Sequence, residues 1–119
     1  MKGDNLAERL LDFAATVIRF SSRLPKQPWT RHIASQLVRS ATSGGANYDE
    51  ARRAESRKDF AHKTQVAAKE MGESIFWLRL VQRTGLIEGN IQGLVGEATE
   101  LTSILAASAK TAKAPLRPE

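Results

Sequence analysis

Two helices and the turn between them are encoded in the stretch from Arg39 to Lys63, which reads RSATSGGANYDEARRAESRKDFAHK. Residues 40–47 of this stretch are all small. The adjacent Gly44 and Gly45 cost a helix about 1 kcal/mol each relative to alanine, and close approach of another backbone is the usual compensation. Because the apolar spacing stays in phase across the glycines, we expect one continuous helix over about 29–53; a break at the pair is the alternative.

The second part of the stretch predicts where the next helix begins. Ser56 is the expected N-cap, and Asp59 occupies the third helical position in a variant of the capping box. Apolar residues then recur at helical spacing as far as Val81. Gly85, directly after a turn that contains Arg83, predicts the end of this helix, since glycine adopts the left-handed conformation of a C-terminal stop without strain.

Two further helices flank this pair. The first covers about residues 4–23, with Asp4 or Asn5 as its expected N-cap, and the last covers about residues 88–112. The links between helices are short, so neighbouring helices should run antiparallel. The sequence therefore predicts an all-α, antiparallel up-down four-helix bundle formed by a single domain of residues 1–113, with a flexible C-terminal tail over 114–119.

Composition excludes several classes of protein. The 119 residues contain no cysteine, which rules out disulfides, a thiolate zinc site and a cysteine nucleophile. No apolar segment approaches the 18 residues or so that a membrane-spanning helix needs, and the start of the chain lacks the apolar core of a secretion signal. We therefore expect a soluble, cytoplasmic protein with no membrane partner.

Basic residues are concentrated away from the C-terminal part of the chain. The formal net charge is +5, and residues 1–39 carry seven basic and three acidic residues. The turn between the two central helices forms a basic corner whose members are Arg52, Arg53, Arg57, Lys58 and Lys63. These residues either contact nucleic-acid phosphates or form a solvated corner of weak ion pairs; the sequence leaves both interpretations open. A second candidate basic patch comprises Arg9, Arg19, Arg23, Lys26, Arg31 and Arg39.

Carboxylates on the central helices raise the question of a metal site. Glu70 and Glu73 face one side of their helix, and Glu50 could approach them from the preceding helix. A di-metal site in a helical bundle needs two Glu-x-x-His pairs, whereas this chain offers only Asp59 with His62 in a comparable spacing. We expect satisfied polar contacts here, with no metal, no cofactor, no catalytic residue and no enzymatic activity; a metal-dependent enzyme is the alternative.

The third helix has more apolar surface than one core stripe requires. Phe76, Trp77 and Leu80 are candidates for a subunit interface, against the simpler interpretation that they close the core of their own subunit. Trp29 is expected to pack at the start of the second helix. Aromatic residues make up only 6% of the chain and most lie on apolar stripes, so no single-strand stacking platform and no sequence-specific recognition are expected.

The stretch from Arg39 to Lys63 resembles the signature of the four-helix bundle protein family, first noticed in intervening sequences of bacterial 23S ribosomal RNA genes. The positions that match are Ser43, Asn47, Glu50, Ser56, Asp59 and Phe60. A second matching stretch, from Val66 to Ile87, reads VAAKEMGESIFWLRLVQRTGLI and places Glu70, Glu73 and Trp77 where the family has acidic and bulky residues. The resemblance covers about residues 5–110. Many members have glycine where this chain has Ala51, so a helix break there is less expected than in those relatives.

This resemblance implies an antiparallel four-helix bundle, a homopentameric ring and no established enzymatic activity. The chain also resembles accessory proteins of diversity-generating retroelements, which are pentamers of the same fold that bind nucleic acid and work with a reverse transcriptase. We therefore expect a homopentamer that binds RNA or DNA through its basic corners; the polar residues expected to hold helix positions or line the subunit contact are Asn47, Glu50, Glu70 and Glu73. The alternative is a scaffold that docks a protein partner such as a reverse transcriptase without binding nucleic acid.

Overall fold

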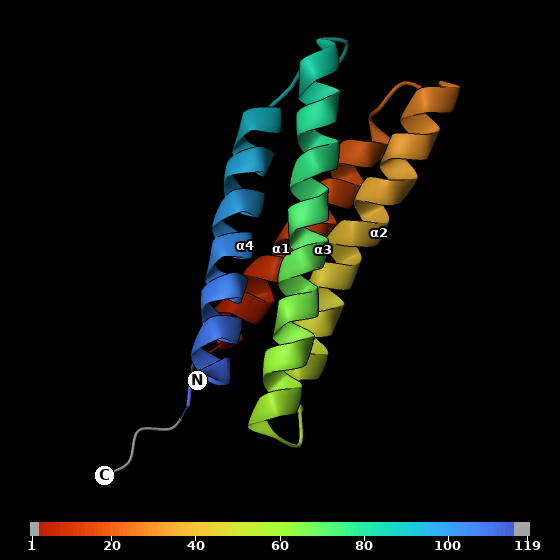
Figure 1. The fold of residues 1–119 in the computed structure, drawn as a ribbon. Coiled ribbons are helices and arrows are strands. Elements are labelled where there is room, and N and C mark those ends of the chain that lie inside the picture. Colours follow the sequence, from red (N-terminus) through yellow and green to blue (C-terminus); the bar gives the residue numbers. More distant parts are fainter. Residues whose placement is uncertain (1–2, 116–119) are drawn as a thin grey trace.

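Four long helices account for most of the chain. The computed structural model describes residues 3–115, and within them it contains no strand. The helices are α1 (Asp4–Ser22), α2 (Pro28–Ala51), α3 (Arg57–Thr84) and α4 (Ile91–Lys113). Successive helices run in opposite directions along a bundle that measures 58 × 22 × 21 Å (Figure 1). The predicted all-α, antiparallel four-helix fold is confirmed.

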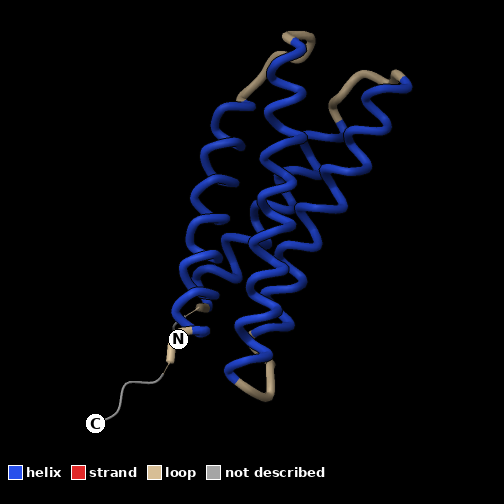
Figure 2. The backbone as a smooth tube through the Cα atoms, viewed as in Figure 1, coloured by secondary structure: helices blue, strands red, loops and turns tan. Residues whose placement is uncertain are grey.

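The four helices are not packed equally tightly. α3 packs extensively against both α2 and α4, whereas α1 packs mainly against α2 and has a much smaller contact with α4. α1 and α3 have no backbone contact and lie diagonally opposite each other across the bundle. Figure 2 shows the long helices joined by short loops. The small contact between α1 and α4 is bridged by Arg9, whose guanidinium lies 2.7 Å from the Glu97 carboxylate and 3.4 Å from that of Glu100.

One buried apolar cluster draws on all four helices. Its fully buried members come from stripes that repeat every three or four residues, as the sequence predicts for amphipathic helices. The largest of them are Leu10, Val17, Leu37, Met71, Leu78, Val81, Leu101 and Leu105. Between α2 and α3 the core also contains two small hydroxyl side chains, Ser40 and Ser74, whose Oγ atoms share a 2.8 Å hydrogen bond. Small side chains at this interface let the two helix axes approach closely.

The glycine pair explains this close approach. α2 runs without a break through Gly44 and Gly45, as expected from the apolar spacing. A methyl group on Gly44 would lie 2.7 Å from the Cγ and Sδ atoms of Met71 on α3. A methyl group on Gly45 would lie 3.6 to 3.8 Å from Leu10 on α1, including its backbone. The two glycines thus let α2 pack against both of its neighbours at the same level.

Helix ends agree with the sequence in the centre of the chain and differ at its outer helices. Ser56 caps α3 by accepting a 3.0 Å hydrogen bond from the Asp59 amide, and Gly85 ends it with a φ of 65°. The expected capping of α1 by Asp4 or Asn5 is wrong: the N-cap is Gly3, with a φ of 95° and no side-chain cap. The Asp4 carboxylate instead pairs with Arg52 of α2, an interaction between distant segments.

The start of α4 also differs from the prediction. Gly89 has a φ of 125°, which is not a helical conformation, so α4 cannot extend back through this residue. Asn90 is the N-cap, and its side-chain oxygen accepts a 2.9 Å hydrogen bond from the Gly93 amide. α4 therefore begins at Ile91 instead of near Glu88. Of the tail expected over 114–119, residues 116–119 lie outside the described part of the chain.

We predict that Gly44→Val destabilises the fold by about 1–3 kcal/mol, because the added side chain overpacks the contact with Met71. The free energy of unfolding, measured by urea denaturation, tests this. Gly96→Val on α4 is the matched control, since a methyl group there meets no atom within 4 Å. It should leave stability unchanged or raise it by about 0.5 kcal/mol through helix propensity. Equal stability of the two variants would contradict the proposed role of Gly44.

Candidate nucleic-acid interface

The basic corner lies at one end of the bundle, where α2 ends and α3 begins. Residues 52–56 form the turn between the two helices, so that Arg52 and Arg53 follow α2 directly while Arg57 and Lys58 open α3. Lys63 lies more than one turn further along α3, on the side of α2. The five cations predicted from sequence are therefore near one another in space, but they do not share one chemical environment.

Three of the five cations are held by carboxylates of the same chain. Arg53 lies 2.7 Å from Asp49, and Arg52 pairs with Asp4. The Lys63 amine lies 3.1 Å from Glu50 and 3.3 Å from Asp59, and hydrogen bonds to these carboxylates raise the pKa of Lys63 above its ordinary value. Because each charge already has a counter-charge, these three residues contribute little net positive potential to a ligand.

The other two cations have no carboxylate partner among residues 3–115. The Arg57 guanidinium donates a 2.9 Å hydrogen bond to the backbone carbonyl of Thr111, at the C-terminal end of α4. Lys58 is exposed, and no carboxylate of the described residues pairs with it. Sequence reasoning placed both residues correctly at a cationic corner, but it did not separate them from the three neutralised cations.

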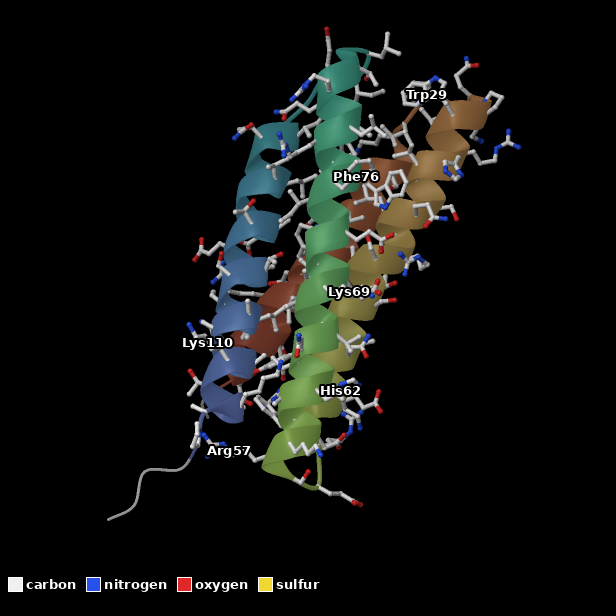
Figure 3. All side chains as sticks on the ribbon, in the orientation of Figure 1. Trp29, Arg57, His62, Lys69, Phe76 and Lys110 are labelled. Carbon is white, nitrogen blue, oxygen red and sulfur yellow. The ribbon has the colours of Figure 1, made fainter. Side chains whose placement is uncertain are left out.

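Two further cations join this end from α4. Lys110 and Lys113 lie in the last turn of α4, and Lys113 donates a hydrogen bond to the Gln65 side chain of α3. Arg57 and Lys110 occur at the same end of the bundle in Figure 3. A groove of about 570 Å³ runs between the two helices, lined by Arg57, Lys58, Ala61, His62, Gln65, Ala112, Lys113 and Ala114. We name Arg57, Lys58, Lys110 and Lys113 the basic end.

Sequence reasoning did not include Lys110 and Lys113 in the candidate interface. The signal was available, because Lys110 and Lys113 lie at the end of the last predicted helix, and an up-down bundle returns that end to the corner between the second and third helices. Cations in a last helical turn are also the usual complement of the helix dipole. Because this role already accounts for the two lysines, sequence reasoning did not assign them to a binding surface.

The second basic patch is divided in the same way. Arg9 is bound to Glu97, and Arg39 lies 2.9 Å from Glu70 and also pairs with Glu73. The remaining members have no carboxylate partner in the part of the chain that the structure describes, and they lie near the opposite end of the bundle; they are Arg19, Arg23, Lys26 and Arg31.

The expected approach of Glu50 to Glu70 and Glu73 is wrong. α2 and α3 run antiparallel from the turn, so a residue near the end of α2 lies opposite the first turns of α3, and Glu50 reaches Lys63. Glu70 and Glu73 lie further from the turn and face Arg39. No group of three or more potential metal-ligating side chains occurs among the described residues.

Asn47 forms its contact within α2. Its side-chain amide donates a 2.8 Å hydrogen bond to the carbonyl of Ser43, one turn earlier in the same helix. The side chain is half-buried. Asn47 is therefore accounted for within one subunit, and its expected place at a subunit contact stays a prediction.

The apolar candidates on α3 form a partly exposed cluster. Phe76 is 59% exposed and Leu80 is 37% exposed, while Trp77 is half-buried. The Trp77 ring meets Phe76 edge-on at a centroid distance of 5.0 Å and His32 at 6.0 Å. Trp77 packs against the core, whereas Phe76 and Leu80 remain exposed beside it. We call Phe76, Trp77 and Leu80 the α3 patch, and its place in a subunit interface stays a prediction. Trp29 packs half-buried against the core, as expected.

A second exposed apolar stripe was not predicted. Leu11 is 64% exposed and Ile18 is 49% exposed, both on α1. Seven residues separate them, which is two helical turns, so they lie on one face of the helix. We call this pair the α1 stripe. Since α1 and α3 lie diagonally opposite, the α1 stripe and the α3 patch are on different flanks of the bundle.

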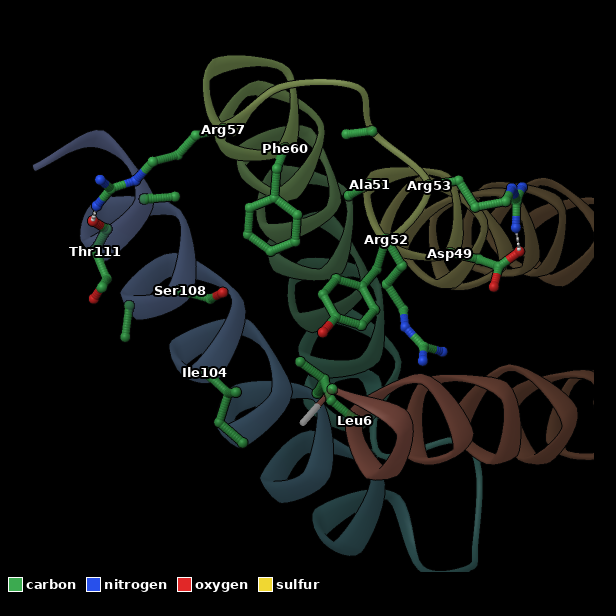
Figure 4. Close-up of a pocket in the computed structure, with 15 residues that line it drawn as sticks. Leu6, Asp49, Ala51, Arg52, Arg53, Arg57, Phe60, Ile104, Ser108 and Thr111 are labelled. Carbon is green, nitrogen blue, oxygen red and sulfur yellow. Dashed lines mark hydrogen bonds and ion pairs between the residues drawn. The ribbon is translucent and has the colours of Figure 1, made fainter. Parts of the chain in front are cut away.

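A pocket of about 940 Å³ opens between the helices at the same end as the basic residues (Figure 4). All four helices contribute to it: Leu6 comes from α1, Tyr48 from α2, Phe60 from α3 and Ile104 from α4. Arginines lie around it, and α4 also supplies hydroxyl side chains. Sequence reasoning missed this pocket because it is formed only where four helix ends meet.

The fold and the site together define a small helical-bundle protein with a cationic end. The chain belongs to the 23S rRNA-intervening sequence protein family, whose model matches residues 5–107. It is similar to a protein of unknown function from the S23 ribosomal protein family of Bacteroides thetaiotaomicron, with 32% identity and a TM-score of 0.80 over 88% of this chain and 98% of that one.

No curated protein matches the chain. The family description names no enzymatic activity, and the similar crystal structure is of a protein of unknown function. In the described part of the chain, no helix is long and apolar enough to cross a membrane.

Tyr48 is the single tyrosine of the chain. We predict that its pKa lies above the ordinary tyrosine value of about 10, because burial disfavours the ionised phenolate. The folded state favours the neutral phenol. The stability that the neutral side chain provides is therefore fully present below about pH 10, and the folded protein loses it as the pH rises through the pKa of Tyr48 in the folded state. Alkaline titration of tyrosinate absorbance measures this directly. The chain unfolded in guanidinium is the control, and identical midpoints would contradict the prediction.

Proposed function

We propose that this protein is a non-enzymatic homo-oligomer that binds nucleic-acid phosphates through the basic end. The observation that carries the proposal is the set of four cations, Arg57, Lys58, Lys110 and Lys113, that no carboxylate of the described residues neutralises. Lys and Arg side chains that no carboxylate neutralises release counterions from a phosphate backbone when they bind it. The proposal narrows the interface expected from sequence, because Arg52, Arg53 and Lys63 are engaged within the chain.

Self-association would strengthen this binding. In a cyclic ring all subunits keep the same orientation relative to the axis. A ring of five elongated bundles arranged around such an axis would therefore gather five basic ends on one face. Each phosphate contact adds to the affinity and to its salt dependence, so a modest patch on one subunit becomes a strong site on the assembly.

The two apolar surfaces support a ring in particular. A closed ring uses heterologous contacts, in which one surface of a subunit meets a different surface of the next. The α3 patch and the α1 stripe lie on different flanks of the bundle, as such contacts require. The charges around them are also complementary: Glu8 and Asp12 accompany the α1 stripe, whereas Arg79 and Arg83 accompany the α3 patch. We propose that these two surfaces meet between neighbouring subunits.

Replacing Arg57 and Lys58 with glutamine should weaken binding to RNA or duplex DNA and make it less sensitive to salt. Loss of two phosphate contacts per bound subunit lowers the slope of log affinity against log salt concentration by about 1.8 for duplex DNA and by about 1.4 for a single strand. Fluorescence anisotropy with labelled nucleic acid at several salt concentrations measures both quantities.

The matched control replaces Arg23 and Lys26 with glutamine, which removes the same charge from the opposite end of the bundle. It should leave the salt slope nearly unchanged. If the control variant loses more affinity than the Arg57/Lys58 variant, the basic end is not the binding surface. If wild-type protein shows no salt-sensitive binding to RNA or DNA, the proposal fails and a scaffold for a protein partner becomes the better explanation.

Replacing Phe76 and Leu80 with serine should reduce the mass of the assembly, because the exposed apolar area that self-association would bury is lost. Light scattering should give five times the 13.1 kDa chain mass for wild-type protein and a smaller multiple for this variant. Leu11→Ser with Ile18→Ser should have the same effect. Leu86→Ser, at an exposed loop residue outside both surfaces, is the control. A wild-type monomer at micromolar concentration would rule out the ring.

A further inference from the structure

The pocket at the basic end has the shape and lining of a small-ligand site. Its volume of about 940 Å³ lies within the range of roughly 300–1,000 Å³ typical of such sites. Apolar side chains from four helices form its walls, and the half-buried Phe60 offers an aromatic ring. In Figure 4 the Phe60 ring lies between Arg57 on one side and Arg52 on the other, with Leu6 and Ile104 further along the pocket. This is an apolar cavity with three arginines at its margin, Arg52, Arg53 and Arg57, of which only Arg57 has no carboxylate partner among the described residues.

Tyr48 adds a polar group to the apolar wall of the pocket. Its side chain is only 4% exposed and lines the pocket, and among residues 3–115 its hydroxyl forms no hydrogen bond. The hydroxyl atom is not among the buried polar atoms without a partner, so it is open to solvent. It lies close to Gly3. A ligand in the pocket can therefore hydrogen-bond to this hydroxyl without displacing another side chain.

The polar groups around the pocket favour an anion beside a planar group. Arg57 is held at the margin by the Thr111 carbonyl and has no carboxylate partner in the described chain. Arg53 and Asp49 neutralise each other at 2.7 Å, so that the remaining local charge is positive. Ser108 and Thr111 of α4 add side-chain hydroxyls to the lining. Hydroxyls beside an aromatic ring suit the polar edge of a heteroaromatic base better than they suit an alkyl chain.

We propose that this pocket receives one unpaired nucleotide of a single-stranded nucleic acid. The base lies against Phe60 with its edge at the Tyr48 hydroxyl, and the adjoining phosphate contacts Arg57. The inference rests on the proposed function and adds to it a preference for single strands, because the bases of a duplex are paired and stacked and are unavailable to a pocket. It also revises the expectation that the chain has no aromatic surface for a base.

The test compares two single-stranded DNA probes of equal length, one with normal bases and one in which every base is replaced by an abasic residue. Both carry the same phosphates, so a purely electrostatic interface binds them equally. Stacking of one base contributes about 1–3 kcal/mol, and wild-type protein should therefore bind the probe with bases roughly tenfold more tightly. Anisotropy at constant salt measures the ratio.

Ala107→Trp places a large ring in the lining of the pocket and should abolish the tenfold preference, while binding of the abasic probe remains unchanged. Ala106→Trp is the matched control: the residue is exposed on the same helix and does not line the pocket. It should keep the preference. Circular dichroism and light scattering of both variants show whether helix content and assembly are preserved.

The outcomes separate this inference from the proposed function. Equal, salt-sensitive binding of the two probes by wild-type protein would overturn the base pocket and leave phosphate binding intact. Loss of the preference in both tryptophan variants would overturn the assignment of the base to this pocket. Absence of binding to either probe at any salt concentration would overturn the proposed function and the inference with it.

Discussion

The close contact that Gly44 and Gly45 allow on α2 is the constraint on which the rest of the bundle depends. Successive residues of a helix point about 100° apart, so two adjacent glycines open two neighbouring faces. One face accepts Met71 of α3, and the other approaches the backbone of Leu10 on α1. The loss of helix propensity at two positions is offset by tight packing against two helices, and α2 becomes the element that positions both.

The surplus apolar surface follows from this arrangement. Because α2 separates α1 from α3, these helices lie diagonally opposite and each has a face that no other helix of the chain covers. Leu11 and Ile18 on α1, and Phe76 and Leu80 on α3, occupy those faces. The four helices of one chain leave this area uncovered, and it is the surface that the proposed ring would bury through contacts between different flanks.

At the basic end, the N-terminus of α3 and the C-terminal end of α4 have opposite effects on a nearby cation. Arg57 opens α3, where the helix dipole disfavours a cation, but α4 ends beside it and its Thr111 carbonyl accepts a hydrogen bond from the Arg57 guanidinium. The antiparallel arrangement of α3 and α4 therefore stabilises a charge that α3 alone would oppose. Lys110 and Lys113, which suit the dipole of α4, add to the same surface. Cations that are stabilised by carbonyls instead of carboxylates remain available to phosphates.

The sequence by itself determined the helices, their order and the central turn, because amphipathic spacing, the Ser56 cap and the Gly85 stop are interactions within a few residues of the chain. It also located the corner where Arg57 lies. Only the tertiary structure decided which cations are neutralised and which surfaces stay exposed. Those properties, like the end pocket lined by Tyr48, depend on side chains from different helices meeting at one place, and the local periodicity of a single helix carries no information about such meetings.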